Sequence, residues 1–386
     1  MSTQLTSFDV LIVYSERTAY SAGDSSATIV LPFPTDSDNS SLNYVYSYFI
    51  ESCQAIGLSA AFSTSADITG PGLFSSYWIF VNNVWAKVNA PCYASQIFDK
   101  FSPVNKEIST RRKLLFSSKR VQQFNNTLLF DIFFDKQKTY NTLAEFAIPT
   151  VTTKADSLVN IKLACRRLSS LVQARENAVD FSGDIIMKDR FGAGGWNVYR
   201  LKRDDYASML GVQQANPNIS FILQPFTNFD RGFCYHNRRA ATDIRLIYLS
   251  DKLVQSYFRM AKTGDFRCNE HQGGSSTYLK LNEIPQRVKA QADQITARLA
   301  KQQTLYALDF IIGNSGIVHF IEGNTGPGLS WNKSIKHEAF MAKKLIRQIA
   351  KTIQGKITLR KVHQDNHNLK ITPKALNQEY IEALYI

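Results

Sequence analysis

The sequence predicts an α/β protein in which strands and helices alternate over most of the chain. Short apolar runs of strand length are separated by segments whose apolar residues recur at helical spacing, and turn-forming glycines and prolines lie between them. The 386 residues are 44% hydrophobic, which suits a large core and two or three domains. No stretch has the roughly eighteen uninterrupted apolar residues of a membrane helix, so no membrane span is expected.

Residues 1–128 are predicted to form a small N-terminal α/β domain. The runs 8–14 and 78–84 have the composition of buried strands, and 45–57 fits a helix. Between them, 21–41 is rich in Ser, Asp and Gly and is expected to be an irregular loop.

Residues 129–355 show the clearest alternation and are predicted to form a second domain, followed by a tail of mixed composition at 356–386. The tail could pack on the body or fray. Strands are expected at 184–188, 197–201, 221–226, 244–249, 252–260, 306–312 and 317–324, and helices at 137–146, 156–177, 284–302 and 337–354.

The formal net charge of +13 is unevenly distributed. The first 100 residues hold three Lys and Arg against eight Asp and Glu, whereas the rest holds 42 against 24. Such a balance fits a polyanionic partner such as nucleic acid, a site for triphosphate and an acidic substrate, or a solvated basic surface. Charge alone leaves these open, and the basic run 111–120 is best explained as a solvated helix face.

Several function classes find no support. The five cysteines are scattered and lack metal-ligand spacing, so a reducing cytoplasm is the default compartment. Asp9 interrupts the first apolar run, which argues against a signal peptide. No GxSxG elbow or nucleophilic cysteine signature is present, and Cys268 is interpreted as a bystander.

The strongest chemical pattern lies on two neighbouring strands near the end of the second domain. Asp309 interrupts the apolar run YALDFII, and Glu322 and Asn324 share one face of the next strand. If these strands pair through the turn GNSG, the three oxygen-bearing side chains converge, as a hard cation such as Mg²⁺ requires. The alternative is a structural ion pair. As metal ligands, Asp309 and Glu322 should be removable without unfolding the chain.

The segment MKDRFGAGG at 187–195 suits phosphate binding. Lys188 ends a buried strand, and the backbone N–H groups of Gly192, Gly194 and Gly195 can turn toward an anion. A glycine-rich hairpin turn has the same composition, so the pattern alone is weak. It matches neither a P-loop nor a dinucleotide-binding fingerprint.

A third candidate is the polar run 261–274. It holds Lys262, Arg267, Asn269 and His271 after a strand carrying Arg259, and several such donors suit a transferring phosphoryl group or an acyl phosphate. From composition alone, a surface loop is the simpler interpretation.

Taken in order, these motifs resemble the ATP-grasp superfamily, and within it the RimK-type glutamate ligases. The resemblance covers roughly residues 130–350. It rests on FFDKQKTYNTLAEFAIPT at 133–150, Lys188, LQPF at 223–226, DIR at 243–245, GDFRCNEHQGG at 264–274 and EGNTGPGL at 322–329.

The resemblance implies an N-terminal substrate-side domain before a two-lobed ATP-grasp unit, with a hinge near 221–227 and ATP between the lobes. It also implies roles for individual residues. Lys136 or Lys138 would contact ATP phosphates with Lys188, Gly194 and Gly195; Gln224, Pro225 and Phe226 would hold adenine; Asp243 would touch the nucleotide; Arg259, Arg267 and Asn269 would serve the γ-phosphate and acyl phosphate; and Asp309, Glu322 and Asn324 would bind Mg²⁺ or Mn²⁺.

The activity implied is ATP-dependent joining of a carboxylate to an amine through an acyl phosphate. The acceptor is expected to be an amino acid, a peptide or a protein tail, with glutamate a candidate for addition. One alternative is a ligase that makes a small peptide or specialised metabolite, as glutathione synthetase does. Another is a non-catalytic nucleotide- or RNA-binding protein, which the intact Asp309, Glu322 and Asn324 set disfavours.

Two departures from the family pattern stand out. The loop DRFGAGGWNV carries an arginine and aromatics where small polar residues are usual, and an Arg-rich insertion lies within 224–243. The N-terminal region matches no motif, so the two substrates and the oligomeric state stay unassigned.

Overall fold

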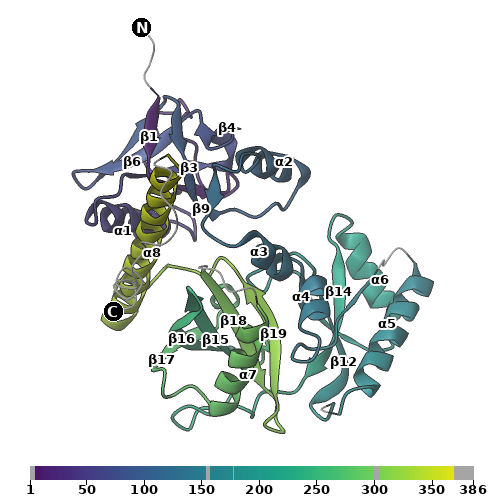
Figure 1. The fold of residues 1–386 in the computed structure, drawn as a ribbon. Coiled ribbons are helices and arrows are strands. Elements are labelled where there is room, and N and C mark those ends of the chain that lie inside the picture. Colours follow the sequence, from purple (N-terminus) through teal and green to yellow (C-terminus); the bar gives the residue numbers. More distant parts are fainter. Residues whose placement is uncertain (1–4, 154–156, 177, 300–304, 369–386) are drawn as a thin grey trace. The chain divides into compact units, whose positions relative to one another are not determined.

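The structure is a computed structural model that describes residues 5–153, 157–176, 178–299 and 305–368 (Figure 1). The chain divides into two compact units. One consists of residues 126–327, and the other combines residues 1–125 with 328–386. No helix among the described residues is both long and apolar enough to cross a membrane.

The first lobe of unit 126–327 is a four-stranded sheet covered by two helices (Figure 1). Residues that point to one side of the sheet pack against α5 and α6, and Met187 and Phe221 are completely buried there. The strands lie in the order β11 (Val151–Thr152), β14 (Phe221–Thr227), β12 (Phe181–Asp189) and β13 (Val198–Lys202), and the helices are α5 (Leu158–Gln173) and α6 (Tyr206–Ala215).

The second lobe is a five-stranded antiparallel sheet with α7 (Gln286–Arg298) on one face. Its central strands β15 and β18 are buried along their whole length, which explains their almost continuously apolar sequences. The strands lie in the order β17 (Ser275–Leu279), β16 (Lys252–Met260), β15 (Thr242–Leu249), β18 (Leu305–Ile312) and β19 (Val318–Asn324).

Two short helices precede the first lobe: α3 (Thr127–Phe134) and α4 (Lys136–Thr142). Asn126 and Asp135 cap them, each accepting hydrogen bonds from backbone N–H groups of the first turn. α3 packs closely on β19 because Gly323 has no side chain: a Cβ there would come within 2.4 Å of the Phe133 ring.

The other unit contains a mixed six-stranded sheet and a small four-stranded sheet. In the larger sheet β10, β9, β2 and β3 are parallel, and β6 and β7 add an antiparallel hairpin. The larger sheet runs β10 (Gln122–Gln123), β9 (Gln96–Lys100), β2 (Val10–Tyr14), β3 (Ala60–Thr64), β6 (Tyr77–Val81), β7 (Val84–Val88), and the smaller one runs β1 (Thr6–Phe8), β8 (Cys92–Ala94), β5 (Leu73–Phe74), β4 (Ile68–Gly70).

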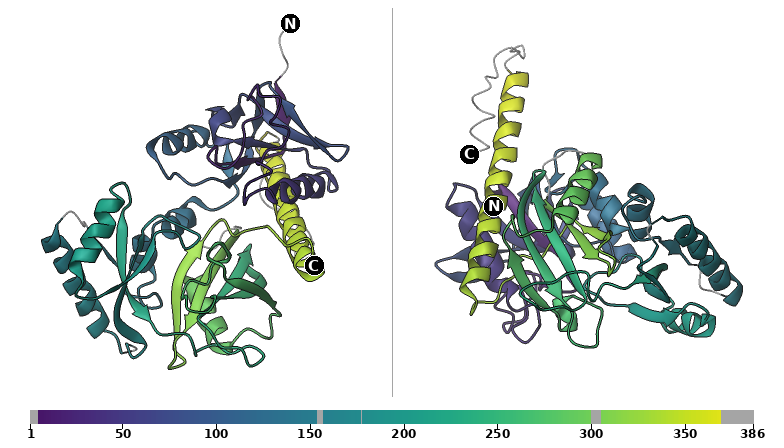
Figure 2. Two further views of the ribbon diagram at one scale, coloured as in Figure 1. Left: turned by 180° about the vertical axis from the view of Figure 1, so that it is seen from behind. Right: turned by 90° about the horizontal axis from the view of Figure 1, so that it is seen from below.

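Helices α1 (Leu42–Gln54), α2 (Lys106–Leu115) and α8 (Lys336–Asn368) belong to this unit. α8 lies beside α1, as both views in Figure 2 show. The predicted domain 129–355 therefore differs from the compact unit, which ends at Pro327 because the apolar side of α8 packs with residues of the N-terminal region. α8 also continues well past the predicted end at 354.

The fold class and most predicted elements of the second domain are confirmed. All seven predicted strands are present, and the predicted helices correspond to α4, α5, α7 and α8 with shifted ends. The basic run 111–120 is the expected solvated surface only in part. Lys113, Lys119 and Arg120 are exposed, but α2 ends at Leu115, and Arg112 is buried, with its guanidinium 2.7 Å from Asp99.

Candidate functional site

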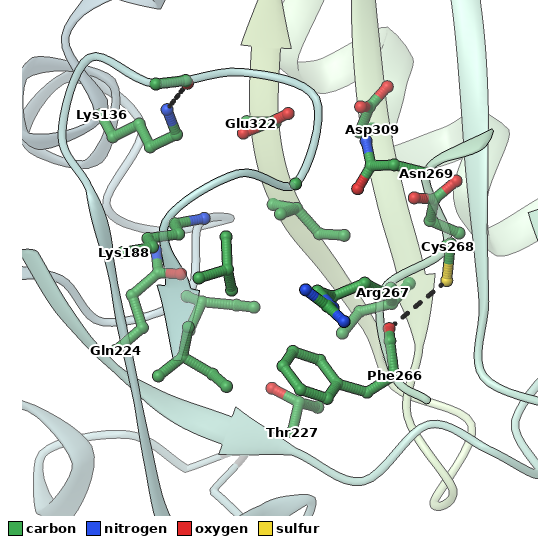
Figure 3. Close-up of a pocket in the computed structure, with 18 of the residues that line it drawn as sticks. Lys136, Lys188, Gln224, Thr227, Phe266, Arg267, Cys268, Asn269, Asp309 and Glu322 are labelled. Atoms are coloured by element: carbon green, nitrogen blue, oxygen red, sulfur yellow. Dashed lines mark hydrogen bonds between the residues drawn. The ribbon is translucent and has the colours of Figure 1, made fainter. Parts of the chain in front are cut away.

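A pocket in unit 126–327 is lined by residues from both lobes (Figure 3). One part of its wall is charged and the other apolar. The charged part includes Lys136, Lys188, Arg267, Asp309 and Glu322; the apolar part includes Ile148, Ile186, Phe226, Phe266, Ile311 and Ile321.

Lys188 is the most deeply buried cation of the first lobe. It is 7% exposed at the end of β12, lines the pocket, and makes no hydrogen bond or ion pair with any residue the structure describes. Burial lowers its pKa to about 8, although the carboxylates of Glu322 and Asp309 oppose that shift. An ammonium group in this position is suited to an anionic ligand.

Lys136 supplies a second cation at the start of α4. Its ammonium group donates to the Gly192 carbonyl, so it lies against the turn between β12 and β13 (Figure 3). Of the two lysines proposed as alternatives from the sequence, only Lys136 lines this pocket, whereas Lys138 is exposed to solvent.

The turn between β12 and β13 is held to α4 by a two-point ion pair. Arg190 donates from Nε and Nη2 to the two oxygens of Asp135, both at 2.7 Å. Burial alone would raise the pKa of Asp135, but the hydrogen bonds and charge of Arg190 and the two cap N–H groups hold it below its ordinary value. The arginine in this loop thus has a positioning role.

Two glycines allow the turn to approach the loop 261–274. Gly194 and Gly195 have φ of +71° and +75°, in the region that favours glycine. A Cβ at Gly195 would also come within 2.7 Å of Asn269 Oδ1, so any larger residue would push the two loops apart.

The second lobe contributes a buried network of two carboxylates and two guanidinium groups. Arg259 donates to both oxygens of Asp243 at 2.8 Å, and its Nη2 also lies 3.1 Å from Asp309. Arg245, which faces Asp309 across β15 and β18, donates to it from Nε at 2.6 Å and from Nη2. All four residues are less than 9% exposed.

The charges of this network balance, and Asp309 is ionised within it. Burial alone would raise the pKa of Asp309, but Arg245 and Arg259 outweigh that effect and the pKa lies below its ordinary value. We therefore revise one expectation: Asp309 also neutralises buried arginines, so its removal should affect folding as well as chemistry.

Glu322 is opposite Asp309 in the β18–β19 pairing, as the predicted hairpin requires. Both residues line the pocket, and Glu322 has no ion pair among the described residues (Figure 3). Asn324 is not part of the pocket wall; its Oδ1 accepts a 2.7 Å hydrogen bond from the Gly326 N–H.

Two neighbouring carboxylates suit Mg²⁺ or Mn²⁺, because such ions commonly bind one or two protein carboxylates together with phosphate oxygens. No cluster of three His, Cys, Asp or Glu side chains with metal-binding geometry occurs in the described part of the chain. The donor set thus fits a metal that arrives with phosphate better than a metal held by protein alone.

The segment Gln224–Phe226 forms the middle of β14 and lines the pocket. Gln224 donates to Thr150 Oγ1 at 2.8 Å, which anchors its side chain to the first lobe. Phe226 packs edge-to-face against Phe266, with ring centroids 5.5 Å apart. These rings and the neighbouring isoleucines form an apolar surface that can accept a planar base.

The loop 261–274 supplies Arg267 and Asn269 to the same pocket. The Arg267 guanidinium is fixed by Asp265, at 3.2 Å from Nε and 2.9 Å from Nη2. Cys268 is buried, and burial raises the pKa of its thiol, which agrees with the expectation that it is a bystander.

Most of the residues selected from the sequence thus share one pocket. The wall includes Lys136, Lys188, Gly194, Gly195, Gln224, Pro225, Phe226, Asp243, Arg259, Arg267, Asn269, Asp309 and Glu322, and it lacks Lys138 and Asn324. Sequence reasoning missed Arg245 and the Arg190–Asp135 pair. A charged residue inside the apolar run IRLIYL was a usable signal for Arg245, because a charge there requires a partner.

Comparison with known proteins identifies a family and related proteins. The family model of the RimK-like ATP-grasp domain matches residues 135–349. A probable alpha-L-glutamate ligase of Haemophilus ducreyi is 26% identical over 216 residues, covering 55% of this chain and 61% of its relative. A glutathione synthetase of Buchnera aphidicola is 30% identical over 126 residues, covering 31% of this chain and 35% of that protein. The chain thus spans less than two thirds of these relatives.

Solved structures share the fold at low sequence identity. D-alanyl-alanine synthetase A of Vibrio cholerae has a TM-score of 0.54 at 13% identity, covering 91% of this chain and 99% of that one. A RimK-domain ATP-grasp protein of Sphaerobacter thermophilus has a TM-score of 0.51 at 12% identity, covering 88% of this chain and 98% of that one. The family match spans more than half of the 386 residues, and the chain belongs to the RimK-like ATP-grasp family.

Proposed function

We propose that this protein is an ATP-dependent ligase that joins a carboxylate to an amine. The observation that carries the proposal is the composition of one pocket wall: Lys136, Lys188 and Arg267 lie near the carboxylates of Asp309 and Glu322, beside an apolar surface. Cations suit the phosphates of a nucleotide, carboxylates suit its metal ion, and the apolar surface suits its base.

In the proposed reaction a carboxylate oxygen of the substrate attacks the γ-phosphorus of ATP, and the bond to the β-phosphate oxygen breaks to release ADP. The amine then attacks the carbonyl carbon of the acyl phosphate, the C–N bond forms, and phosphate leaves with the C–O bonding electrons. The amine loses a proton during this step. No protein nucleophile is needed, so the residues act by positioning and by neutralising charge.

Each lobe has a distinct task in this proposal. Lys136 and Lys188 hold phosphate oxygens, and the N–H groups at Gly194 and Gly195 provide further donors. Arg267, fixed by Asp265, is oriented to stabilise charge on the transferring phosphoryl group.

Asp309 and Glu322 would hold Mg²⁺ or Mn²⁺, which supplies charge neutralisation on the phosphates. We keep Asn324 as a proposed further ligand on the same strand, although its amide oxygen now accepts from Gly326. Asp243 and Arg259 line the pocket as an ion pair and would orient the nucleotide and the acyl phosphate, respectively.

We propose addition of an amino acid such as glutamate to a peptide or protein acceptor. The similarity to proteins named alpha-L-glutamate ligase supports this choice. Synthesis of a small peptide is the second candidate, favoured by the similarity to a glutathione synthetase. All five cysteines are free thiols, which supports a reducing compartment such as the cytoplasm.

The test is release of ADP and phosphate from Mg·ATP in the presence of pools of amino acids and acidic peptides. We expect release that requires a carboxylate and an amine together. Separation of labelled products by size then distinguishes a protein or peptide acceptor from a small amine. Tight ATP binding with no release stimulated by any pool would contradict the ligase proposal.

A further inference from the structure

The exposed side of α8 carries a line of positive charge, called here the basic face: Lys336, Lys344, Arg347 and Lys351. All four residues are exposed, and their spacing of three, four or eight residues places them along one side of the helix. The helix is the yellow element of Figure 1. At 1.5 Å per residue, the basic face is about 22 Å long.

In the described part of the chain, no acidic side chain forms an ion pair with this face. Between residues 333 and 361 the sequence contains nine Lys and Arg and one acidic residue, Glu338. Glu338 accepts a hydrogen bond from the Asn332 N–H at 3.1 Å, and the described residues form no ion pair with any member of the basic face.

The arrangement works against helix stability. Lys344 and Arg347 are three residues apart, and Arg347 and Lys351 are four apart, so like charges meet on the surface. Lys336 also lies in the first turn, where the helix dipole disfavours a cation. A local conflict of this kind, which no ion pair among the described residues offsets, points to a ligand outside the protein.

Neighbouring cations are held in place by aromatic rings of the same unit. Arg347 donates to the Tyr48 hydroxyl at 2.6 Å, and the Lys343 ammonium lies 4.9 Å from the Tyr48 ring centre. Lys333 lies 3.8 Å from the ring centre of Tyr44. These contacts restrict the cationic side chains before any ligand binds, which reduces the entropy lost on binding.

We propose that the basic face of α8 binds the phosphate backbone of a nucleic acid without sequence preference. A nucleic acid presents a regular line of negative charge whatever its sequence, which complements a line of cations about 22 Å long. The nearby rings are occupied: Trp331 is 8% exposed, and Lys333 and Lys343 cover Tyr44 and Tyr48. The contact is therefore to phosphates rather than to stacked bases.

A membrane surface is disfavoured as the partner. Among the described residues, Phe340 is the large exposed apolar side chain between Lys336 and Lys351, and Ile335 and Leu359 are exposed beyond these ends, so no continuous apolar face lies beside the cations. Binding at a membrane interface normally requires a continuous apolar face beside the cations.

The experiment measures binding of a labelled 20-nucleotide oligouridine RNA by fluorescence anisotropy, with the full chain at several salt concentrations. The test variant carries Lys336→Gln, Lys344→Gln, Arg347→Gln and Lys351→Gln. A matched control loses the same charge from exposed positions of α5 and α7, through Lys162→Gln, Arg166→Gln, Arg167→Gln and Lys289→Gln.

We expect the α8 variant to lose about tenfold or more in affinity, and its slope of log affinity against log salt to fall by about 3, as four lost phosphate contacts to a single strand predict. The control should stay within about twofold of the original protein. Saturating Mg·ATP should not displace the RNA, since the pocket is elsewhere. Circular dichroism and thermal melting establish that both variants are folded.

Three outcomes would overturn the proposal. Equal losses in both variants would mean that net charge, not this face, binds RNA. Unchanged RNA affinity of the α8 variant would show that the basic face does not bind RNA. A polyglutamate peptide that displaces the RNA at equal charge concentration and prefers the same face would identify an acidic polypeptide as the partner. None of these results depends on the proposed ligase activity.

Discussion

Two lysines, Lys188 (buried) in one compact unit and Lys356 (half-buried) in the other, have similarly lowered pKa values but different surroundings. Lys188 ends β12 beside the pocket and has no hydrogen-bonding partner among the described residues. Lys356 lies in α8, where its ammonium donates to the Phe124 carbonyl at 2.8 Å and lies 4.8 Å from the Phe124 ring centre. Burial lowers the pKa of each to about 8. Only the lysine without a partner faces a cavity.

Two buried carboxylates differ in the same way. Asp67, in the unit formed by residues 1–125 and 328–386, accepts hydrogen bonds from the hydroxyls of Ser21, Thr64 and Ser76 at 2.5–2.7 Å. Asp309 is instead held by two guanidinium groups and lines the pocket. Burial of charge is therefore informative about function where a cavity adjoins it, and about stability elsewhere.

The largest expected effect is on folding. Asp309→Ala leaves Arg245 and Arg259 with excess buried positive charge, and we expect a loss of about 3–5 kcal/mol in the free energy of unfolding. Denaturant titration measures it. A loss below about 1 kcal/mol would mean that Asp309, like a simple metal ligand, is dispensable for the fold.

Glu322→Gln should affect chemistry alone, because Glu322 has no ion pair within the described ranges. We expect ATP turnover to fall about a hundredfold or more while the unfolding midpoint is nearly unchanged. Turnover and denaturant titrations are compared with those of Asp309→Ala. Full ATP turnover by this variant with Mg²⁺ as the only metal would show that Glu322 is not a metal ligand.

Lys188→Met tests the functional lysine. We expect ATP affinity to fall about tenfold, as removal of one charged phosphate contact predicts, without loss of stability. Lys188 is protonated below pH 8 in the folded protein, so ATP affinity of the original protein should fall as the pH rises through about 8. The variant should lack this step in isothermal titration calorimetry. Lys356→Met is the matched control and should bind ATP normally.

Lys356→Met should change only how the stability depends on pH. The pKa of Lys356 is about 8 when folded and near 10.4 in an unfolded chain, so the unfolded state holds more protons between these values. The original protein should therefore gain stability relative to the variant as the pH rises from about 8 to about 10. Parallel unfolding curves at each pH provide the measurement, and a constant difference would mean that Lys356 is not buried as a charged group.

The sequence was most informative where the spacing of apolar residues and the chemistry of individual side chains indicated the same structure. The strands carrying Asp309 and Glu322 were predicted from their apolar runs. The two carboxylates were selected because a charge in an apolar run requires a partner, and the β18–β19 pairing places these two residues opposite each other. The position of Asn324 outside the pocket depends on the short turn to Gly326, which strand alternation does not encode. The choice of Lys136 over Lys138 depends on where α4 begins, set by Asp135 and its pairing with Arg190.

Contacts between segments that are far apart in the sequence could not be predicted. The sequence did not indicate that α8 packs beside α1, because its apolar stripe predicts burial without naming a partner. The same applies to Arg112, whose partner Asp99 lies on another element. A segment whose charged residues are exposed can have the same amino-acid composition as one whose charged residues are buried in ion pairs with another element.

The most direct test of the account is the fate of oxygen in the carboxylate substrate. With that carboxylate labelled by ¹⁸O, attack on the γ-phosphorus and later loss of phosphate should transfer one labelled oxygen to each phosphate released during amide formation, as mass spectrometry detects. Amide formation with unlabelled phosphate would contradict the acyl-phosphate route. ATP hydrolysis that releases only unlabelled phosphate, with no amide formed, would contradict the ligase itself.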